Sequence, residues 1–391
     1  MKLFISIAGL VLLILTEILR VYFIMPFPGS QQSNSVDIAY FIGSNIHYIR
    51  LILLGLIMYP FYRVLLFPSR KYKIVLFVFV ALYGVVFYLF NFRFLAETMF
   101  YQPKVISFAT ANSSKVSLDK LIIGIEINGA AKAYPIQYIG YHHQVRDTMG
   151  NQPVMVTYCT VCRTGRVFNP FVNGKNEQFR LVGMDHFNAM FEDATTKSWW
   201  RQVSGEAVTG PLKGERLKEI PSKQMRLSSW LELHPSSLIL QPDSNFKSDY
   251  DDLAKFDDGT IKSGLEKRDS SSWKEKSWVV GIKSGPHSKA YDWNELVSTM
   301  IVEDSLPGLD ILLLLENDKV SFHAFSRKVN DLELHFTKNN DGMLVDNITS
   351  SVWNMKGKCI SGKFIGAQLA SIPAYQEFWH SWRTFNPLTL R

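Results

Sequence analysis

The chain has 391 residues, of which 47% are hydrophobic and 20% are charged, and its formal net charge is +7 at neutral pH. This length allows a membrane anchor and two domains of ordinary size. The excess positive charge is modest and its lysines and arginines are dispersed, so no nucleic-acid partner is expected, and attraction to anionic lipid is its simpler meaning.

Three apolar stretches occupy the first quarter of the chain. Leu3–Phe27 and Ile74–Phe92 are long enough to cross a bilayer, and Leu51–Phe67 is shorter and interrupted by Arg63. The first stretch is too long for a signal peptide. We therefore predict three transmembrane helices, and interpret them as an anchor rather than as a transporter.

Basic residues predict how these helices are oriented. The loop after the second stretch carries Arg70, Lys71 and Lys73, whereas residues 28–48 contain neither lysine nor arginine. Loops rich in lysine and arginine stay in the cytoplasm. The sequence thus predicts a multi-pass protein of the cell membrane, with its soluble region on the extracytoplasmic side and the bilayer as its one assigned partner.

The sequence of the soluble region contains an internal repeat. Gly124-Ile125 aligns with Gly281-Ile282, Lys132-Ala133-Tyr134 aligns with Lys289-Ala290-Tyr291, and Trp230 later falls on Trp382. Residues that both copies keep are expected to serve a shared fold, and residues private to one copy are candidates for function. We predict five parts: a three-helix anchor (1–98), a linker (99–117), a first repeat with the Cys-x-x-Cys site (118–240), a polar linker (241–276) and a second repeat that lacks the site (277–391).

Each copy reads as mainly β. Residues 121–127 and 131–136 alternate around Asn128-Gly129, a pair typical of a tight hairpin turn, and Asn173-Gly174 marks another turn. A short helix is expected over Ser228–Leu233. The predicted fold class is a mainly β (α+β) soluble region of two tandem homologous repeats, preceded by three transmembrane helices.

The cysteines of the first copy have no counterpart in the second. Cys159 and Cys162 align with Glu316 and Lys319, which are expected to face each other across the Asn317-Asp318 turn of a β-hairpin. A tight turn would bring the two thiols together, where they could bind a metal or form a disulfide. Arg163 and Arg166 are also private to the first copy, and nearby positive charge lowers the pKa of a thiol.

Further candidate metal ligands, with sulfur or nitrogen donor atoms, occur in the first copy and not in the second. His142 lacks a counterpart, and a longer loop carries His186 and Met190. With Cys159 and Cys162 these residues predict a copper or zinc ion, because thiolate, imidazole and thioether together favour copper, and thiolate with imidazole suits zinc equally. Asp185 would orient the His186 ring through a hydrogen bond. Arg163 and Arg166 would stabilise the two thiolates by their positive charge.

A longer motif carries a family resemblance. The runs are His142 with Asp147-Thr148-Met149-Gly150, Val156-Thr157-Tyr158-Cys159-Thr160-Val161-Cys162, and Ser198-Trp199-Trp200-Arg201-Gln202 with Gly205-Glu206-Ala207. Together they resemble the family called domain of unknown function 3179, in a membrane-anchored form. The resemblance implies a fold group from about Lys120 to Pro387, and it implies no activity.

Three functions stay open. The leading hypothesis is an extracytoplasmic metal-binding protein with Cys159, Cys162 and His142 as ligands, completed by His186 or Met190. The second is a thiol–disulfide oxidoreductase in which the two cysteines cycle. The third is a non-catalytic envelope module with a structural disulfide, so the sequence leaves open whether the protein is an enzyme.

Overall fold

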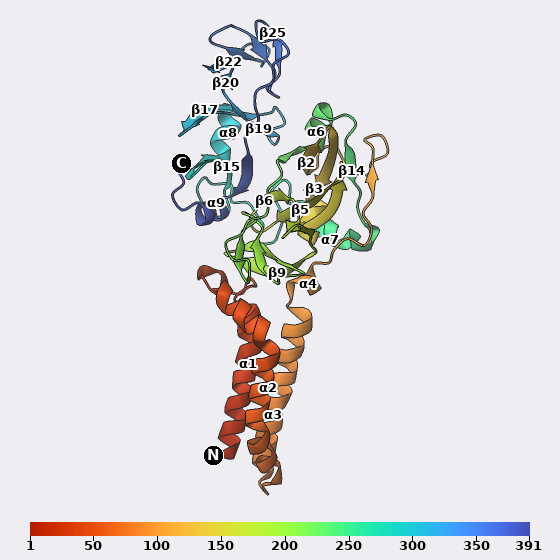
Figure 1. Ribbon diagram of the computed structural model, residues 1–391, viewed down its shortest axis with the longest axis vertical. Coiled ribbons are helices and arrows are strands. Elements are labelled where there is room, and N and C mark those ends of the chain that lie inside the picture. The colour runs from red at the N-terminus through yellow and green to blue at the C-terminus, as the bar shows by residue number, and fades with distance from the viewer. The chain divides into compact units, whose positions relative to one another are not determined.

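The computed structural model describes residues 1–391, and contacts divide the chain into two compact units (Figure 1). The first, here called the anchor unit, joins Met1–Tyr101 to Pro170–Leu217. The second, here called the C-terminal unit, joins Gln102–Asn169 to Lys218–Arg391. Each unit is described by itself.

Three long helices begin the anchor unit. They are α1 (Lys2–Tyr22), α2 (Val36–Leu66) and α3 (Arg70–Tyr88), the last continued by a π-helical turn, η2 (Leu89–Arg93). All three are long and apolar enough to cross a membrane, so the three predicted apolar stretches form helices of spanning length. The second helix is longer than predicted.

Helices α1 and α2 approach closely at Gly9. A Cβ atom at this position would lie 1.9 Å from Cγ2 of Ile57, so only glycine fits there. Small residues let helix backbones approach in this way inside a membrane.

A small antiparallel sheet completes the anchor unit. Its strand order is β12-β11-β10-β9. One sheet face packs with Ile24 and Ala39, through Val182, Met190 and Trp199. The remaining elements are η1 (Ser30–Gln32), α4 (Ala96–Met99), β7 (Phe171–Val172), β8 (Lys175–Asn176), β9 (Phe179–Asp185), β10 (Asn188–Asp193), β11 (Trp199–Arg201) and β12 (Ala207–Thr209).

Two series of elements in the C-terminal unit run in the same order: two strands, a short helix and three further strands. The first comprises β2 (Leu121–Ile127), β3 (Ala130–Pro135), α5 (Ile136–His142), β4 (Gln144–Met149), β5 (Gln152–Cys159) and β6 (Thr164–Phe168). The second comprises β15 (Trp278–Ser284), β16 (His287–Asp292), α8 (Trp293–Thr299), β17 (Ile301–Leu306), β18 (Leu309–Leu315) and β19 (Phe322–Ser326).

Each series is closed by a later strand and helix. Strand β13 (Lys223–Arg226) pairs with β2 and leads into α6 (Leu227–Leu233). Strand β26 (Ala374–Phe378) pairs with β15 and leads into α9 (Trp379–Phe385). The other elements are β1 (Phe108–Ala109), β14 (Leu238–Leu240), η3 (Ser244–Phe246), α7 (Lys247–Asp252), β20 (Lys328–Val329), β21 (Leu332–Glu333), β22 (Phe336–Lys338), β23 (Leu344–Asp346), β24 (Val352–Trp353) and β25 (Cys359–Ser361).

A glycine lies beneath a tryptophan in each series. A Cβ atom at Gly124 would lie 2.5 Å from the Trp230 ring, and one at Gly281 would lie 2.2 Å from the Trp382 ring. Both indoles come from the closing helices and are buried. The aligned glycine and tryptophan positions thus hold helix against sheet in the same way twice.

The segment 241–276, predicted to be a polar linker, is a packed part of the C-terminal unit. Its Phe246, Tyr250, Phe256 and Ile261 are buried. Phe256 and Ile261 belong to the core cluster that contains Tyr158. The many Asp, Lys and Ser residues hid these apolar side chains, which are spaced too irregularly to predict a helix or strand.

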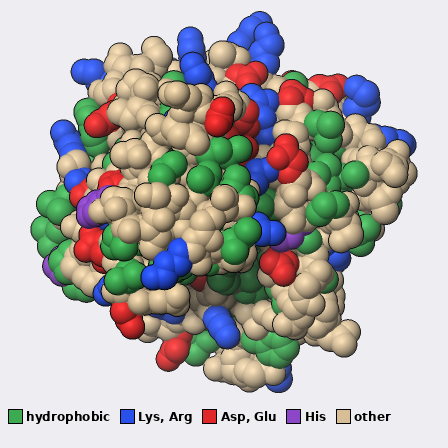
Figure 2. Space-filling view, turned by 90° about the horizontal axis from the view of Figure 1, so that it is seen from above, with side chains coloured by type: hydrophobic (Ala, Val, Ile, Leu, Met, Phe, Trp, Pro, Cys, Tyr) green, Lys and Arg blue, Asp and Glu red, His purple; other side chains and the backbone are tan.

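Charged side chains of both signs are mixed over the surface seen from above in Figure 2. Lysines and arginines on this face alternate with aspartates and glutamates rather than gathering into one basic area. A mixed surface of this kind produces little net attraction for a polyanion.

We predict that Gly281→Ala destabilises the protein. The new methyl group must displace the Trp382 ring, and overpacking of a core costs about 1–3 kcal/mol. Denaturant titration of the full chain in detergent measures the change. Gly264→Ala is the matched control, because a Cβ atom there meets nothing within 4 Å. Equal stability of the two variants would contradict the packing described here.

Candidate functional site

The two cysteines lie on one hairpin of the C-terminal unit. Cys159 ends β5 and is paired with Thr164 at the start of β6, so Cys162 falls in the connecting turn. The turn is closed by a hydrogen bond from the Arg163 amide to the Thr160 carbonyl, 3.2 Å long, and Arg163 has φ of 56°. Both faces of β5 and β6 are buried next to this turn.

Both sulfurs are completely buried and are not joined in a disulfide. The Cys162 and Cys159 side chains form a hydrogen bond with one another, and Cys162 also forms one with Ser381. The thiols therefore converge, as the hairpin predicted. Ser381 comes from α9, far along the chain from the cysteines.

The C-terminal residues also hold the main chain of the turn. The Phe378 amide donates to the Cys162 carbonyl over 3.0 Å. The Lys276 ammonium donates to the Val161 carbonyl over 2.7 Å, and His380 Nε2 lies 3.1 Å from the same oxygen. Three separate contacts thus fix the turn against β26, α9 and Lys276, two residues before β15.

A chain of buried polar groups leads away from Cys162. Ser381 Oγ donates to Glu377 Oε2 over 2.9 Å, and Arg166 Nη2 donates to Glu377 Oε1 over 2.5 Å. The Arg166 guanidinium lies 3.5 Å from the ring centroid of Tyr375. Cys162, Ser381, Glu377 and Arg166 therefore form one continuous series of contacts inside the protein.

Burial dominates the ionisation of this site. It raises the pKa of Cys162 well above the usual range, reinforced by Cys159 and opposed by Lys276 and Ser381. Burial also raises the pKa of Glu377, although Arg166 opposes it. Burial lowers the pKa of Lys276, whose charge the two cysteines favour. Burial thus favours the neutral form of each of these three groups.

The two arginines after the cysteines have other partners than predicted. Arg163 donates to Gln376 Oε1 over 2.9 Å and to the carbonyls of Phe256 and Asp257, and its guanidinium lies 3.8 Å from the Trp278 ring centroid. Arg166 is bound to Glu377. The cation that acts on the thiols is Lys276, which no local sequence pattern connected with the cysteines.

His142 is buried among aromatic side chains. Its Nε2 lies 2.6 Å from the Tyr250 hydroxyl, and its ring packs edge-on against Tyr141 and Phe246. No three His, Cys, Asp or Glu side chains of the chain are grouped to hold a metal ion, so His142 and the two cysteines form no such ligand set. The predicted copper or zinc site stays a prediction.

The other predicted ligands lie in the anchor unit. His186 and Phe187 form the turn between β9 and β10, both with positive φ. His186 Nδ1 lies 2.6 Å from Asp185 Oδ1, and Arg201 donates to Asp185 Oδ2. Burial opposes ionisation of Asp185, but these partners outweigh it and lower the pKa. Met190 is completely buried in the core of the small sheet.

The residues around the turn between β9 and β10 contact the residues between α1 and α2. The Met184 amide donates to the Ile24 carbonyl over 2.7 Å, and the Phe187 amide donates to Gln31 Oε1 over 3.0 Å. Gly183 leaves room for the Ile24 carbonyl, which a Cβ atom would meet at 2.2 Å. These residues therefore attach the sheet to the segment that joins α1 and α2.

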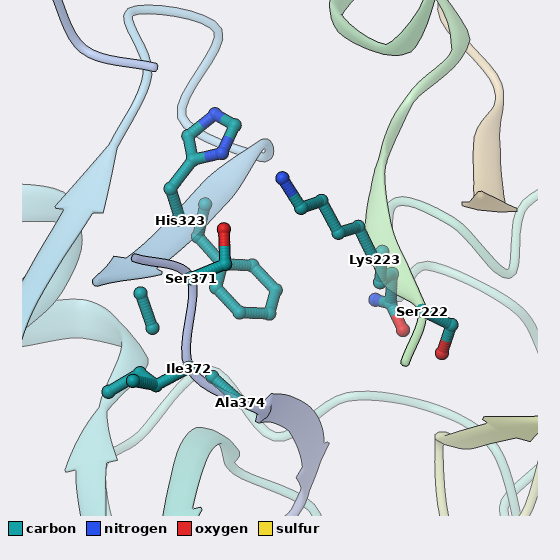
Figure 3. A pocket seen from close by; sticks show the side chains of 9 residues that line it. Ser222, Lys223, His323, Ser371, Ile372 and Ala374 are labelled. Atoms are coloured by element: carbon teal, nitrogen blue, oxygen red, sulfur yellow. The ribbon is translucent and has the colours of Figure 1, made fainter. Parts of the chain in front are cut away.

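The hairpin of β18 and β19 makes a corresponding contact without cysteines. Ser229 of α6 donates to Glu316 Oε1 over 2.5 Å, and His323 Nε2 lies 2.6 Å from the same oxygen. Lys223 and His323 reach toward one another across a small cavity of about 30 Å³ (Figure 3). A space of this size holds about one water molecule, so it is too small for a substrate.

Comparison with known proteins places this arrangement in a family. The model of the family described as "Protein of unknown function (DUF3179)" matches residues 100–389, and the chain belongs to this family. No curated protein and no solved structure matches the chain.

We predict that acid destabilises the protein through His380. Burial, and then the Lys276 ammonium, lower the pKa of His380 to about 3. An unfolded histidine takes up its proton near pH 6.5, so stability is complete above that pH and falls as the pH drops toward 3, by at most about 1.4 kcal/mol per unit. Urea titrations between pH 7 and 4.5 measure this slope.

His380→Gln should flatten the slope, and replacement of the exposed His287 by Gln should leave it unchanged. Part of the slope remains in His380→Gln, because burial lowers the pKa of His143 to about 4. An identical slope in His380→Gln and the native chain would contradict the assignment.

Proposed function

We propose that this protein is a membrane-anchored dithiol–disulfide redox protein in which Cys159 and Cys162 are the redox pair. One observation carries the proposal: the two buried thiols are hydrogen-bonded to one another, beside the Lys276 ammonium and the Ser381–Glu377 pair. A dithiol needs a group that stabilises the thiolate and a group that takes its proton. Both kinds of group are present.

The reaction is an exchange with the disulfide of a partner. One thiolate attacks a sulfur of the partner's disulfide, forming a mixed disulfide and releasing the first partner sulfur as a thiolate. The second cysteine then attacks the bound sulfur of its neighbour and releases the second partner sulfur. Two electrons pass to the partner, and the two protons lost by Cys159 and Cys162 end on its two sulfurs.

The surrounding side chains have distinct roles in this proposal. Lys276 opposes the effect of burial on Cys162 and so stabilises its thiolate. Ser381 hydrogen-bonds to Cys162 and to Glu377, so it can relay the Cys162 proton to that carboxyl. Arg166 holds Glu377 in place.

Access to the sulfurs requires movement, because neither is exposed. The segment 241–276 contacts the turn at two places. Arg163 donates to the carbonyls of Phe256 and Asp257. Nearer the cysteines, Thr160 contacts Glu266 at 2.9 Å and Lys276 contacts the Val161 carbonyl at 2.7 Å. We place the opening at the Glu266 and Lys276 contacts, since each is made by a single side chain of the segment.

The extracytoplasmic side is the location that fits this chemistry. Disulfides persist outside the cytoplasm, where glutathione does not reduce them. The basic residues Arg70, Lys71 and Lys73, at the start of the third helix, support this orientation.

We also infer that the two series of elements are copies of one domain. The Gly–Trp contacts and the Ser229–Glu316 and Ser381–Cys162 contacts support this, since each joins the closing helix of one series to the other hairpin or to its own sheet. In this account the second copy lost the cysteines and serves to complete the dithiol site of the first.

Copper(I) binding is the second candidate. Two thiolates alone suffice for this soft ion, and Lys276 would offset the negative charge of a bis-thiolate complex. Zinc is less well supported, since it prefers four protein donors in a closed site. His142, His186 and Met190 are not needed in this form of the proposal.

We predict a single two-electron transition of Cys159 and Cys162. The full chain in detergent is equilibrated in thiol–disulfide buffers from about −350 to −120 mV, quenched in acid and labelled with a maleimide mass tag. The two cysteines should lose their tags together, and Cys159→Ser or Cys162→Ser should abolish the transition.

Cys359→Ser is the matched control, since Cys359 is equally buried and lies away from the site in β25. Two outcomes would sink the proposal: thiols that stay reduced over the whole range, or one equivalent of copper bound through Cys159 and Cys162, which would establish the second candidate.

We further predict that Lys276→Gln slows the reaction of the dithiol with maleimide. Loss of the ammonium raises the pKa of Cys162, so the rate should fall several-fold at neutral pH and its pH profile should move upward. Lys274→Gln, on an exposed neighbour, is the control. An unchanged pH profile would show that Lys276 acts only on the structure of the turn.

A further inference from the structure

A cluster of charged side chains lies inside the three-helix part of the anchor unit. Glu17 of α1 is completely buried, and Arg50 of α2 donates to both of its carboxylate oxygens, over 2.6 and 2.8 Å. Asn91 of η2 donates to Glu17 over 3.0 Å and accepts from Arg50 over 2.7 Å. The interpretation of the spans as a plain anchor took no account of Glu17, the acidic residue within the first of them.

The cluster has more positive than negative charge. Arg20 lies 3.6 Å from Glu17 and donates to Asn91 and to the Phe90 carbonyl. Two guanidinium groups thus share one carboxylate. The Nε atom of Arg20 is also buried without a hydrogen-bond partner. An unpaired donor and an uncompensated charge are both costly in an apolar environment, so the site calls for an anion.

The position of the cluster restricts which anion can reach it. Glu17 and Arg20 lie in the last turns of α1, within about 8 Å of its end at Tyr22, given a rise of about 1.5 Å per residue. Asn91 likewise lies in the last turn of the third span. The ends of membrane helices are where lipid phosphates lie, and arginine side chains extend toward them.

The cluster is accessible from one side and has apolar neighbours. The Arg20 and Arg50 side chains are each 15% exposed. Large apolar side chains of the same helices, such as Leu15, Tyr88 and Phe92, are exposed along the bundle. A ligand with a phosphate and acyl chains matches both features, whereas a free anion matches only the charge.

We propose that Arg20 and Arg50 bind the phosphate of one phospholipid headgroup. The guanidinium groups present several donors to the phosphate oxygens, and Glu17 with Asn91 keeps both arginines in place. The π-helical turn at Leu89–Arg93 brings Asn91 into this contact. This site is independent of the dithiol and of the function proposed for it.

Native mass spectrometry of the delipidated full chain tests the proposal. The protein is titrated with phosphatidylglycerol, with a diacylglycerol of the same acyl chains and with inorganic phosphate. We expect one molecule of phosphatidylglycerol per chain, bound at least ~10-fold more tightly than either of the others. Equal binding of the diacylglycerol, or equal binding of inorganic phosphate, would overturn the assignment to a phospholipid phosphate.

Two substitutions localise the binding. Arg20→Gln should weaken it by ~10-fold or more, and Arg20→Lys, which keeps the charge, should weaken it less. Arg63→Gln, on an exposed arginine of α2, should have no effect. Helix content by circular dichroism shows that each variant is folded. Tight binding in folded Arg20→Gln equal to that of the native chain would place the lipid elsewhere and overturn the proposal.

Discussion

The hydrogen bond from the Phe378 amide to the Cys162 carbonyl is the contact on which the rest of the dithiol site depends. It joins β26 to the turn of the cysteine hairpin, and α9 begins at the next residue. Because α9 starts there, Ser381 reaches Cys162 and His380 reaches Val161 within a single helical turn. The site is therefore assembled from the middle and the end of the chain at once.

The corresponding contact elsewhere in the C-terminal unit shows what is special about the cysteine hairpin. There the Arg226 amide donates to Ser321 Oγ over 3.0 Å, and Ser229 binds Glu316. A serine is thus present in both places, but the hairpin presents the Glu316 carboxylate to Ser229 and the Cys162 thiol to Ser381. A carboxylate paired with His323 has no redox chemistry, so the electron-transfer proposal is confined to Cys159 and Cys162.

Local patterns in the sequence predicted the parts that depend on local physics. Apolar runs predicted three long apolar helices, and the strand–turn–strand pattern of the aligned segment 311–325 predicted the hairpin that carries Cys159 and Cys162. The aligned Gly124 and Gly281 were correctly assigned to the fold, since each lies beneath an indole ring. The helices and the hairpin depend on residues that are close in sequence. The two contacts beneath the indole rings depend on glycine, which no other residue type can replace there.

Contacts between distant segments could not be predicted in this way. No sequence motif links the cysteines to Lys276, Glu377 and Ser381. These residues come near Cys159 and Cys162 only through tertiary packing. Arg163 was expected beside the thiols, but the positive φ of its turn and the carbonyls of Phe256 and Asp257 give it another place. The loop with Asp185 and His186 was predicted to supply metal ligands because it contains polar residues that the second repeat lacks. In the structure, the backbone of this loop contacts Ile24 and Gln31.

The reduction potential of the Cys159–Cys162 pair in Ser381→Ala tests the central claim most directly. Ser381 Oγ donates to Glu377, so its hydrogen bond with Cys162 uses the thiol proton and exists only in the reduced pair, and its loss should lower the potential by about 20 mV for each ~1 kcal/mol of hydrogen bond removed. Ser229→Ala is the matched control, since Ser229 occupies the aligned position and binds Glu316 instead. A shift in Ser381→Ala alone is the result predicted here. Equal potentials in the native protein and both variants would contradict the claim that the end of the chain completes the dithiol site.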